Sequence, residues 1–458
     1  AAATLSTGER QRMQLARVVR NRTTGILYVL DEPSIGLHPA NVDGLKGVMH
    51  DLIDDGNSIV LVDHDTRILR ESDRIVELGP GAGANGGLII AEGTVAEVEK
   101  DPESRIGLFL SGHEERRVRP IVPIDTMFDE GSIDMTTRAI HTVKPLEIRI
   151  PKGRLTVVTG VSGSGKTTMV LDSLVPGLQA TLDSSPLPEH VVSVSAPGIE
   201  HVKLIDSTPI GANVRSTVAT YANIHDELRK IYARTAEAKS LGYKAGEFSY
   251  NTGSLRCPVC DGTGTVSLDV QFLPDVDIPC PECKGSRYSK AAWSIHIPTP
   301  AGHSVSLPRL MDDDVEQAIE ECGNHRTVTS RLKTLHDLGL GYLTLGEATP
   351  SLSGGEAQRL KLATEMGREQ SDMLFVFDEP TIGLHPLDVR KLLDVFQHLI
   401  SRGATVLVIE HDLDIIRNAD YIIDMGPGGG AAGGSIVASG TPGQIAANTE
   451  SITGRFLH

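Results

Sequence analysis

Short apolar runs, separated by polar and glycine-containing segments, recur in the second part of the chain. Residues 155–159, 374–377 and 405–409 are rich in β-branched or aromatic side chains, and no run exceeds five residues. Continuous runs of this length are typical of strands buried on both faces of a parallel sheet. Residues 357–366 are mostly strong helix formers, so we expect a helix that begins near Gly354. The pattern predicts an α/β protein with a mainly parallel sheet flanked by helices.

One stretch of this pattern occurs twice. VLDEPSIGLHP at residues 29–39 and VFDEPTIGLHP at residues 376–386 lie 347 positions apart. The same spacing relates further pairs of landmarks, which are Ser6 and Ser353, His64 and His411, Gly79 and Gly426, and Ala91 and Ala438. Landmarks that keep one spacing leave no room for an insertion between them. About the first 95 residues and about the last 110 are therefore two copies of one unit.

A candidate phosphate-binding loop follows the apolar run at residues 155–159. GVSGSGKTT at residues 160–168 fits the P-loop pattern Gly-x-x-x-x-Gly-Lys-Thr. In such a loop backbone N–H groups surround nucleotide phosphates, Lys166 contacts the β- and γ-phosphates, and the Thr167 hydroxyl binds Mg²⁺. A chance match in a glycine-rich turn is the alternative. The candidate ATP-binding residues are Gly160, Ser162, Gly163, Gly165, Lys166, Thr167 and Thr168.

The repeated stretch supplies acidic groups for the same site. Asp378 and Glu379 follow the run at residues 374–377, where an aspartate can hold the Mg²⁺ shell and a glutamate can polarise the attacking water. His411 follows the next run and is placed to hydrogen-bond the γ-phosphate or that water. Each motif alone is more often a solvated strand end, but together they indicate an ATPase. We predict Glu379, His411 and Lys166 as its catalytic residues.

LSGGE at residues 352–356 predicts a second anion-binding helix start, because a serine hydroxyl and glycine amides precede strong helix formers. The combination resembles the ABC-type ATPases, in which this signature closes over ATP held by the P-loop of the other half. A glycine-rich helix cap without a ligand is the alternative. The candidate residues are Ser353, Gly354 and Gly355 in the second copy, and Ser6 and Gly8 in LSTGE of the first.

At the repeat spacing, the P-loop partner of Lys166 would fall before residue 1. We therefore expect a first half that begins partway through its fold. One composite site remains, with the P-loop and Glu379 facing residues 5–9. The mirror site keeps Glu32 and His64, but these 458 residues hold no P-loop for it.

Four cysteines between the P-loop and the second signature have the spacing of a zinc site. Two Cys-x₂-Cys pairs are separated by nineteen residues, which is typical of four thiolates around one Zn²⁺ in a structural role. Disulfides are the alternative, and the expected cytoplasmic location disfavours them. Cys322 is left over and is interpreted as a small apolar side chain. The candidate ligands are Cys257, Cys260, Cys280 and Cys283.

Five stretches, in this order, resemble the UvrA family of bacterial nucleotide excision repair: GVSGSGKTT, FSYNTGSLRCPVCDGTG, QFLPDVDIPCPECKGSRY, LSGGEAQRLKLA and DEPTIGLHP. The resemblance covers essentially the whole chain. It implies a homodimer that uses ATP, Mg²⁺ and Zn²⁺, recognises damaged duplex DNA and loads a helicase-like repair partner as part of the SOS response. Other subunits would supply the excision nuclease.

Three departures from the family pattern change these expectations. Ser207 stands where the family commonly has glutamine, which puts coupling between ATP and the inserted region in doubt. Thr7 replaces a glycine of the first signature, and a β-branched residue hinders close backbone approach there. The partner-docking region of the family precedes its first signature, so partner loading is not assigned to these residues.

Charge and hydropathy limit the class of protein. A net charge of −17 argues against coating nucleic acid over the whole surface but allows a local basic groove. We expect no membrane span and a cytoplasmic protein, because the chain has no run of eighteen apolar residues and no export leader. Residues 228–256 form either a DNA-phosphate contact or a solvated helix face. Their basic residues are Arg229, Lys230, Arg234, Lys239, Lys244 and Arg256.

We predict two ABC-type ATPase halves. Residues 1–112 form the C-terminal part of the first half, 113–134 a linker and 135–458 the second half, with a helical and zinc-binding insert at 205–295. The predicted function is ATP-dependent recognition of DNA damage. One alternative is a UvrA-like accessory or self-resistance ATPase that acts on DNA-bound drugs. Another is a non-catalytic, zinc-dependent DNA-binding module.

Overall fold

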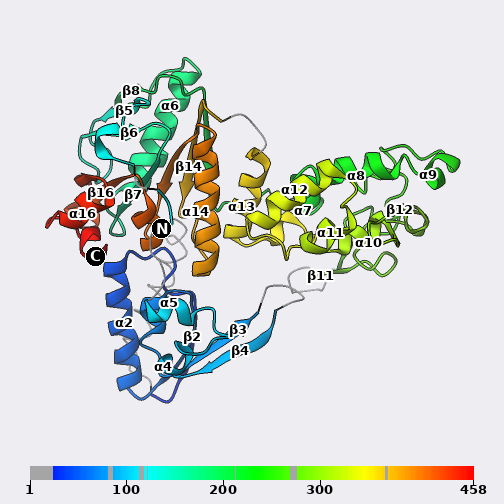
Figure 1. Ribbon diagram of the computed structural model, residues 1–458, viewed down its shortest axis with the longest axis horizontal. Helices are drawn as coiled ribbons and strands as arrows, with labels where there is room; N and C mark the ends of the chain where they lie inside the picture. Colours follow the sequence, from blue (N-terminus) through cyan, green and yellow to red (C-terminus); the bar gives the residue numbers. More distant parts are fainter. Residues whose placement is uncertain are drawn as a thin grey trace. The chain divides into compact units, whose positions relative to one another are not determined.

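The computed structural model describes residues 24–80, 86–112, 118–120, 122–211, 213–268, 276–366 and 370–457 (Figure 1). These residues divide into a larger unit, which ends at Asp206 and resumes at Gln370, and a smaller unit from Ser207 to Met366. The first signature motif, with Ser6, Thr7 and Gly8, lies outside the described residues. No helix in these ranges is long and apolar enough to cross a membrane.

A six-stranded sheet forms the centre of the larger unit, in the order β17-β16-β7-β15-β14-β9. Its neighbouring strands are parallel, except that β17 is antiparallel to β16. The mainly parallel sheet predicted from the apolar runs is therefore confirmed. The strands are β7 (Leu155–Gly160), β9 (His201–Ile205), β14 (Met373–Asp378), β15 (Thr405–Ile409), β16 (Tyr421–Gly426) and β17 (Ser435–Gly440).

Both faces of this sheet are covered, which explains why its strands are continuous apolar runs. On one face Leu374 and Val376 share a core with Leu174 from the helical segment after the P-loop. On the other face Phe377 packs against Phe396, with ring centroids 4.8 Å apart. The covering elements are the π-helical segment Thr168–Leu174, α6 (Val175–Leu182), α14 (Pro386–Ser401, beside β14 in Figure 1) and the antiparallel sheet of β5 (Ser132–Thr137), β6 (Leu146–Pro151) and β8 (Val191–Ser195).

The sequence repeat is also a structural repeat. Helix α2 spans Pro39–Asp54 and α14 spans Pro386–Ser401, so both helix ends are displaced by 347 positions. The first copy consists of β1 (Leu27–Asp31), α2, β2 (Ser58–Val62), α3 (Thr66–Leu69), β3 (Ile75–Gly79), β4 (Leu88–Gly93), α4 (Val95–Val98) and α5 (Gly107–Ser111). Its counterparts are β14, α14, β15, α15 (Leu413–Asn418), β16, β17, α16 (Pro442–Ala447) and the 3₁₀ turn Thr453–Phe456.

The two copies differ in how their strands are covered. In the first copy Leu27 and Val29 of β1 are 59% and 67% exposed, whereas their counterparts Leu374 and Val376 are fully buried. Apolar side chains of α2 cover the opposite face of β1 and β2. Within the described residues, one face of the first copy's strands therefore lies open.

The smaller unit is mainly helical, with two short antiparallel hairpins. Tyr232, Phe248 and Tyr250 are fully buried in it, so these aromatic residues belong to its core. Cys322 is also buried, as expected for a small apolar side chain. The elements are α7 (Val218–Tyr221), α8 (Ile224–Tyr232), α9 (Ala236–Ser240), β10 (Thr265–Leu268), β11 (Val276–Pro279), β12 (His296–Pro298), β13 (Ser304–Ser306), α10 (Leu307–Asp312), α11 (Val315–Glu321), α12 (Arg326–Asp337) and α13 (Gly354–Glu365).

Short 3₁₀ turns connect elements in both units. They lie at Ile124–Thr126, Lys290–Ser294, Thr349–Ser351 and Gly430–Ala432.

Strand β5 begins at Ser132, within the interval expected as a linker, and the smaller unit continues beyond the interval 205–295 expected for the insert. The domain boundaries themselves stay predictions.

A buried ion pair attaches the segment before β5 to the central sheet. Arg119 and Asp420 are 3.2 Å apart, and their side chains are 4% and 1% exposed. The guanidinium also donates to Asn418 O at 2.6 Å, and Asp420 accepts a hydrogen bond from Leu155 N at 2.7 Å. The pair therefore ties Arg119, which lies within the predicted linker, to Asp420 and the start of β7.

We expect Arg119→Ala to lower the free energy of unfolding by about 3–5 kcal/mol, because it leaves the Asp420 carboxylate buried without its cation. Arg74→Ala is the control, since Arg74 and its partner Glu92 are both exposed, and such pairs contribute about 0–1 kcal/mol. Urea denaturation followed by circular dichroism measures both. Equal, small shifts for the two variants would contradict the expectation.

Candidate functional site

The predicted P-loop leaves the sheet at the end of β7. Gly160 has a φ of +131°, and a Cβ there would lie 2.0 Å from the Met425 carbonyl oxygen. Gly165 has a φ of +100°, and a Cβ there would lie 2.5 Å from Val143 Cγ2. Only glycine fits either position, because each combines a left-handed backbone with close neighbours.

A second glycine-rich loop, after β16, donates backbone hydrogen bonds to the P-loop. Gly430 N donates to Gly163 O at 3.0 Å, and Gly434 N donates to Ser164 O at 3.1 Å. The role of this loop in holding the P-loop backbone depends on β16 lying beside β7, which no local pattern reveals.

Lys166 lies buried beneath the loop, where Nζ donates to the carbonyl oxygens of Gly160 and Val161 at 2.9 and 3.1 Å. Burial lowers the pKa of Lys166 to about 8, although the carboxylates of Glu379 and Asp424 oppose this shift. Thr167 is exposed, and Thr168 begins the π-helical segment. Ser162 N donates to Asn41 Oδ1 of α2 at 3.4 Å.

The acidic residues predicted from the repeat lie at the same edge of the sheet. Burial, with Glu379 and Asp206 nearby, raises the pKa of Asp378 to about 7, against the opposing effect of Lys166. Glu379 Oε1 lies 3.5 Å from His411 Nε2. The structure thus brings together Lys166, Asp378, Glu379 and His411, as the sequence pattern predicted for one half of an ATP site.

Glu379 has an unusual backbone conformation. Its φ is +46°, and its counterpart Glu32 in the first copy has a φ of +44°. This left-handed region costs a residue with a Cβ roughly 1–2 kcal/mol. Glu32 also lies 3.6 Å from His64, so the first copy reproduces both the strained turn and the glutamate–histidine contact.

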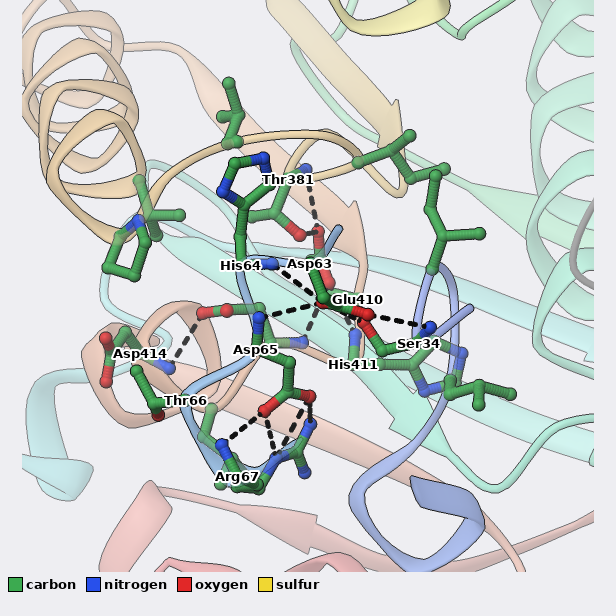
Figure 2. A pocket seen from close by; sticks show the side chains of 18 of the residues that line it. Ser34, Asp63, His64, Asp65, Thr66, Arg67, Thr381, Glu410, His411 and Asp414 are labelled. Atoms are coloured by element: carbon green, nitrogen blue, oxygen red, sulfur yellow. Dashed lines mark hydrogen bonds and ion pairs between the residues drawn. The ribbon is translucent and has the colours of Figure 1, made fainter. Parts of the chain in front are cut away.

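The IGLHP segments of the two copies contact each other's glutamate and histidine. The His38 ring lies edge-on to His411 at 5.8 Å between centroids, and the His385 ring lies edge-on to His64 at 6.1 Å. A Cβ on Gly36 would lie 3.0 Å from Glu379 Oε2. Both copies line one cavity of about 290 Å³, which Figure 2 shows with His64 and His411. The IGLHP pattern alone does not predict these contacts between the copies, because they depend on how the two copies pack.

The second signature begins helix α13 of the smaller unit, as predicted. Ser353 Oγ accepts from Glu356 N at 3.3 Å, and Glu356 Oε2 accepts from Ser353 N at 2.7 Å. Gly354 and Gly355 form the first turn. A Cβ on Gly354 would lie 3.2 Å from that of Ser207, so the residue that departs from the family pattern lies against the signature glycine. That the signature covers ATP stays a prediction.

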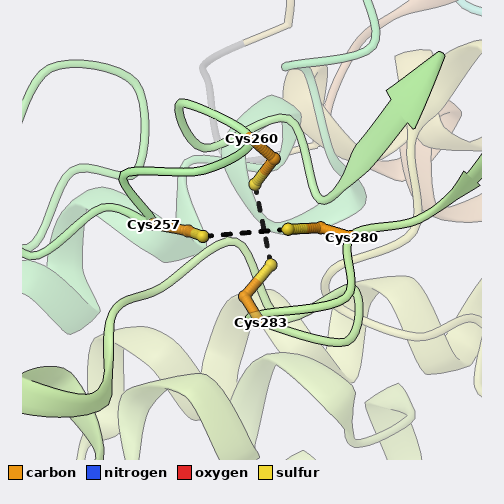
Figure 3. Close-up of side chains that lie close together, drawn as sticks. All are labelled: Cys257, Cys260, Cys280 and Cys283. Atoms are coloured by element: carbon orange, nitrogen blue, oxygen red, sulfur yellow. Dashed lines mark hydrogen bonds between the residues drawn. The ribbon is translucent and has the colours of Figure 1, made fainter.

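The four predicted metal ligands are gathered in the smaller unit (Figure 3). Their Sγ atoms lie within 4.8 Å of one another, with 3.9 Å between Cys257 and Cys280 and 3.6 Å between Cys260 and Cys283. Thiolates at about 2.3 Å around a tetrahedral Zn²⁺ would be about 3.8 Å apart. The cluster therefore fits zinc, and these cysteines form no disulfide.

We expect Cys280→Ser to abolish stoichiometric zinc binding and to lower the thermal midpoint, because a structural zinc ion contributes directly to folding. Metal content after dialysis, measured by inductively coupled plasma mass spectrometry, tests this. Cys322→Ala is the matched control, since Cys322 is equally buried but lies outside the cluster. A parent protein purified without zinc and unable to bind it would contradict the assignment.

Comparisons with known proteins agree with this geometry. UvrABC system protein A of Thermus thermophilus and that of Bacillus subtilis are each 44% identical to the chain, over 100% of this chain and 47% of the relative. The crystal structure of UvrA2 from Deinococcus radiodurans matches with a TM-score of 0.90 and 37% identity, over 99% of this chain and 54% of that chain. No protein-family model matches.

More distant structures share the fold alone. A model of ribosome-bound archaeal Pelota and ABCE1 matches with a TM-score of 0.54 at 18% identity, over 98% of this chain and 58% of that chain. The chain spans about half the length of the curated relatives that it matches.

Proposed function

Because the chain belongs to the UvrA family, we propose that it is the ATP-hydrolysing, DNA-contacting part of a damage sensor in nucleotide excision repair. One observation carries the proposal: Lys166, Asp378, Glu379 and His411 meet at one edge of the parallel sheet. Following the family, the protein would act as a homodimer on duplex DNA, whereas loading of a helicase-like partner belongs to the full-length family and is not assigned to these residues. A nuclease is not part of the proposed activity.

The residues have complementary roles in ATP hydrolysis. Glu379 would take a proton from the attacking water, and His411, 3.5 Å from it, would orient that water or the γ-phosphate. Lys166 would exchange its bonds to the P-loop carbonyls for bonds to phosphate oxygens. The Thr167 hydroxyl and Asp378 are the groups that would hold Mg²⁺, which neutralises phosphate charge.

We expect Glu379→Gln to lower kcat for ATP hydrolysis by about 10²–10⁴-fold, because the general base is lost while nucleotide binding remains. Phosphate release and binding of a fluorescent ATP analogue measure the two properties separately. Glu32→Gln is the matched control, since Glu32 has the same backbone conformation and histidine contact but no P-loop within the 458 residues. Parental turnover by Glu379→Gln would contradict the proposal.

A basic groove on the smaller unit supports the DNA-contact part of the proposal. Helices α8 and α9 and the turn after them line a cavity of about 470 Å³, with Lys230, Arg234, Lys239 and Lys244 around it. Lys230 is paired with Glu227 at 3.0 Å. Clustered cations suit the phosphate backbone of duplex DNA, which they bind without sequence preference.

Lys239→Ala and Lys244→Ala should each weaken duplex binding and reduce the slope of log K against log salt concentration by about 1. Fluorescence anisotropy at several stated salt concentrations measures the slope. Lys333→Ala, an exposed lysine of α12 in the same unit, is the control and should leave the slope unchanged. Equal slopes for all three variants would place the DNA contact elsewhere.

The same titration, repeated with one bulky adduct in the duplex, tests damage recognition. Tighter binding to the adducted duplex supports a lesion sensor. Equal binding would favour the drug-protection alternative, for which Ser207 beside Gly354 is the specific observation. Preferential binding to a drug-bound duplex over the adducted duplex would then distinguish that role from general repair.

A further inference from the structure

One carboxylate in each copy joins the loop of the glutamate to the loop of the histidine. Glu410 comes directly before His411, which contacts the predicted catalytic Glu379, and Asp63 comes directly before His64, which contacts Glu32. Each carboxylate also reaches the hydroxyl residue two positions after the glutamate of its copy, which is Ser34 in the first copy and Thr381 in the second. Figure 2 shows both carboxylates and their hydrogen bonds.

In the second copy both oxygens of Glu410 are fully used. Oε1 accepts from Thr381 N at 3.0 Å and from Thr381 Oγ1 at 2.5 Å. Oε2 accepts from His411 N at 2.6 Å and from Asp412 N at 2.9 Å. One side chain thus bonds the turn that follows Glu379 to the backbone of the histidine loop.

The first copy makes the same bridge with a shorter side chain. Asp63 Oδ1 accepts from Ser34 Oγ at 2.6 Å, from His64 N at 2.7 Å and from Asp65 N at 2.9 Å, and Oδ2 accepts from Ser34 N at 3.2 Å. The acid and the hydroxyl residue both differ between the copies, yet the pattern of four donors is kept. The bridge is therefore a property of the site rather than of one local sequence.

Burial of the bridging carboxylate costs free energy, which indicates that the bridge has a structural or functional role. Glu410 is 2% exposed, and burial raises its pKa although the Thr381 hydroxyl opposes the shift. A buried carboxylate is unfavourable unless donors compensate it. Here the donors hold a turn in which Glu379 adopts a φ of +46°, a conformation that persists only where its surroundings enforce it.

We propose that Glu410 is a positioning residue for ATP hydrolysis: it fixes Glu379 and His411 relative to each other by hydrogen-bonding the loops of both. Asp63 does the same for Glu32 and His64 in the first copy. The inference rests on the proposed ATPase function. Glu410 reaches the reaction only through these loops, so its loss should lower the rate of hydrolysis and leave nucleotide binding by the P-loop intact.

Glu410→Gln is a sharp test because the side chain keeps its size, while an NH₂ donor replaces one of its two acceptor oxygens. Its amide oxygen can still accept two hydrogen bonds, but its NH₂ group would face N–H or O–H donors at the other side. One loop would therefore be released. Asp63→Asn is the matched control in the first copy: there the amide oxygen can keep the three contacts of Oδ1, and only the contact of Oδ2 with Ser34 N is lost.

We expect Glu410→Gln to lower kcat by about 10- to 100-fold, because a small misplacement of catalytic groups has effects of this size. KM for ATP and the affinity for a fluorescent ATP analogue should stay near parental values. Asp63→Asn should keep parental turnover at the site that holds Lys166. Parental kcat in Glu410→Gln, equal loss in both variants, or loss of nucleotide binding would overturn the inference.

Rescue separates positioning from general stability. Glu410→Asp should recover part of the lost kcat, because aspartate makes the same four contacts in the first copy. Thr381→Val should lower kcat in the parent but add little to Glu410→Ala, since Glu410→Ala already removes the acceptor of Thr381 Oγ1. Independent, additive losses would show that the two residues do not act through the bridge.

Amide hydrogen exchange tests the bridge without measuring ATP hydrolysis, so the bridge and the proposed ATPase function can fail separately. Amide hydrogen exchange should speed up in one of the two loops of Glu410→Gln, at Thr381 or at His411 and Asp412, and at Ser34 in Asp63→Asn. If Glu379→Gln shows that the protein is not an ATPase, exchange alone decides the structural claim. Unchanged protection in both loops of Glu410→Gln would overturn it, and a loss confined to those loops would support it.

Discussion

Parallel hydrogen bonding between β7, β15 and β14 is the constraint on which the candidate nucleotide site depends. Leu155 pairs with Val406, and Thr405 pairs with Leu374, so the carboxyl ends of the three strands coincide at one edge. The P-loop, Asp378 and the His411 loop each begin at that edge. Groups from residues 160–166, 378–379 and 411 therefore meet, although more than two hundred positions separate the first from the second.

The duplication provides an internal comparison of the same segment in two environments. The length of helix α2 and its counterpart α14, the positive φ of the glutamate, the glutamate–histidine contact and the carboxylate bridge recur in both copies. Coverage of the strands does not recur, because Val29 is exposed where Val376 is buried. Local geometry thus follows the repeated motif, whereas burial depends on which other layers pack against it.

Much of the fold and of the candidate site could be predicted from the sequence. The apolar runs located the buried strands, the glycine pattern located the candidate P-loop, and cysteine spacing located the four clustered cysteines, because each is a local pattern with one dominant physical explanation. Glu410, His38 and Gly430 were missed. Each acts on residues from another segment, and an acid before a histidine or a glycine in a turn has no distinctive local pattern.

The sequence by itself determined the repeat, the parallel α/β class, the P-loop residues, the helix start at Ser353 and the four cysteines. These follow from hydrophobic periodicity, backbone requirements and ligand chemistry within short segments. Only the tertiary structure decided that Glu410 joins two loops, that His38 of one copy packs on His411 of the other, and that Ser207 lies against Gly354. Those contacts depend on sheet order and packing, which bring distant segments together in ways that local spacing does not encode.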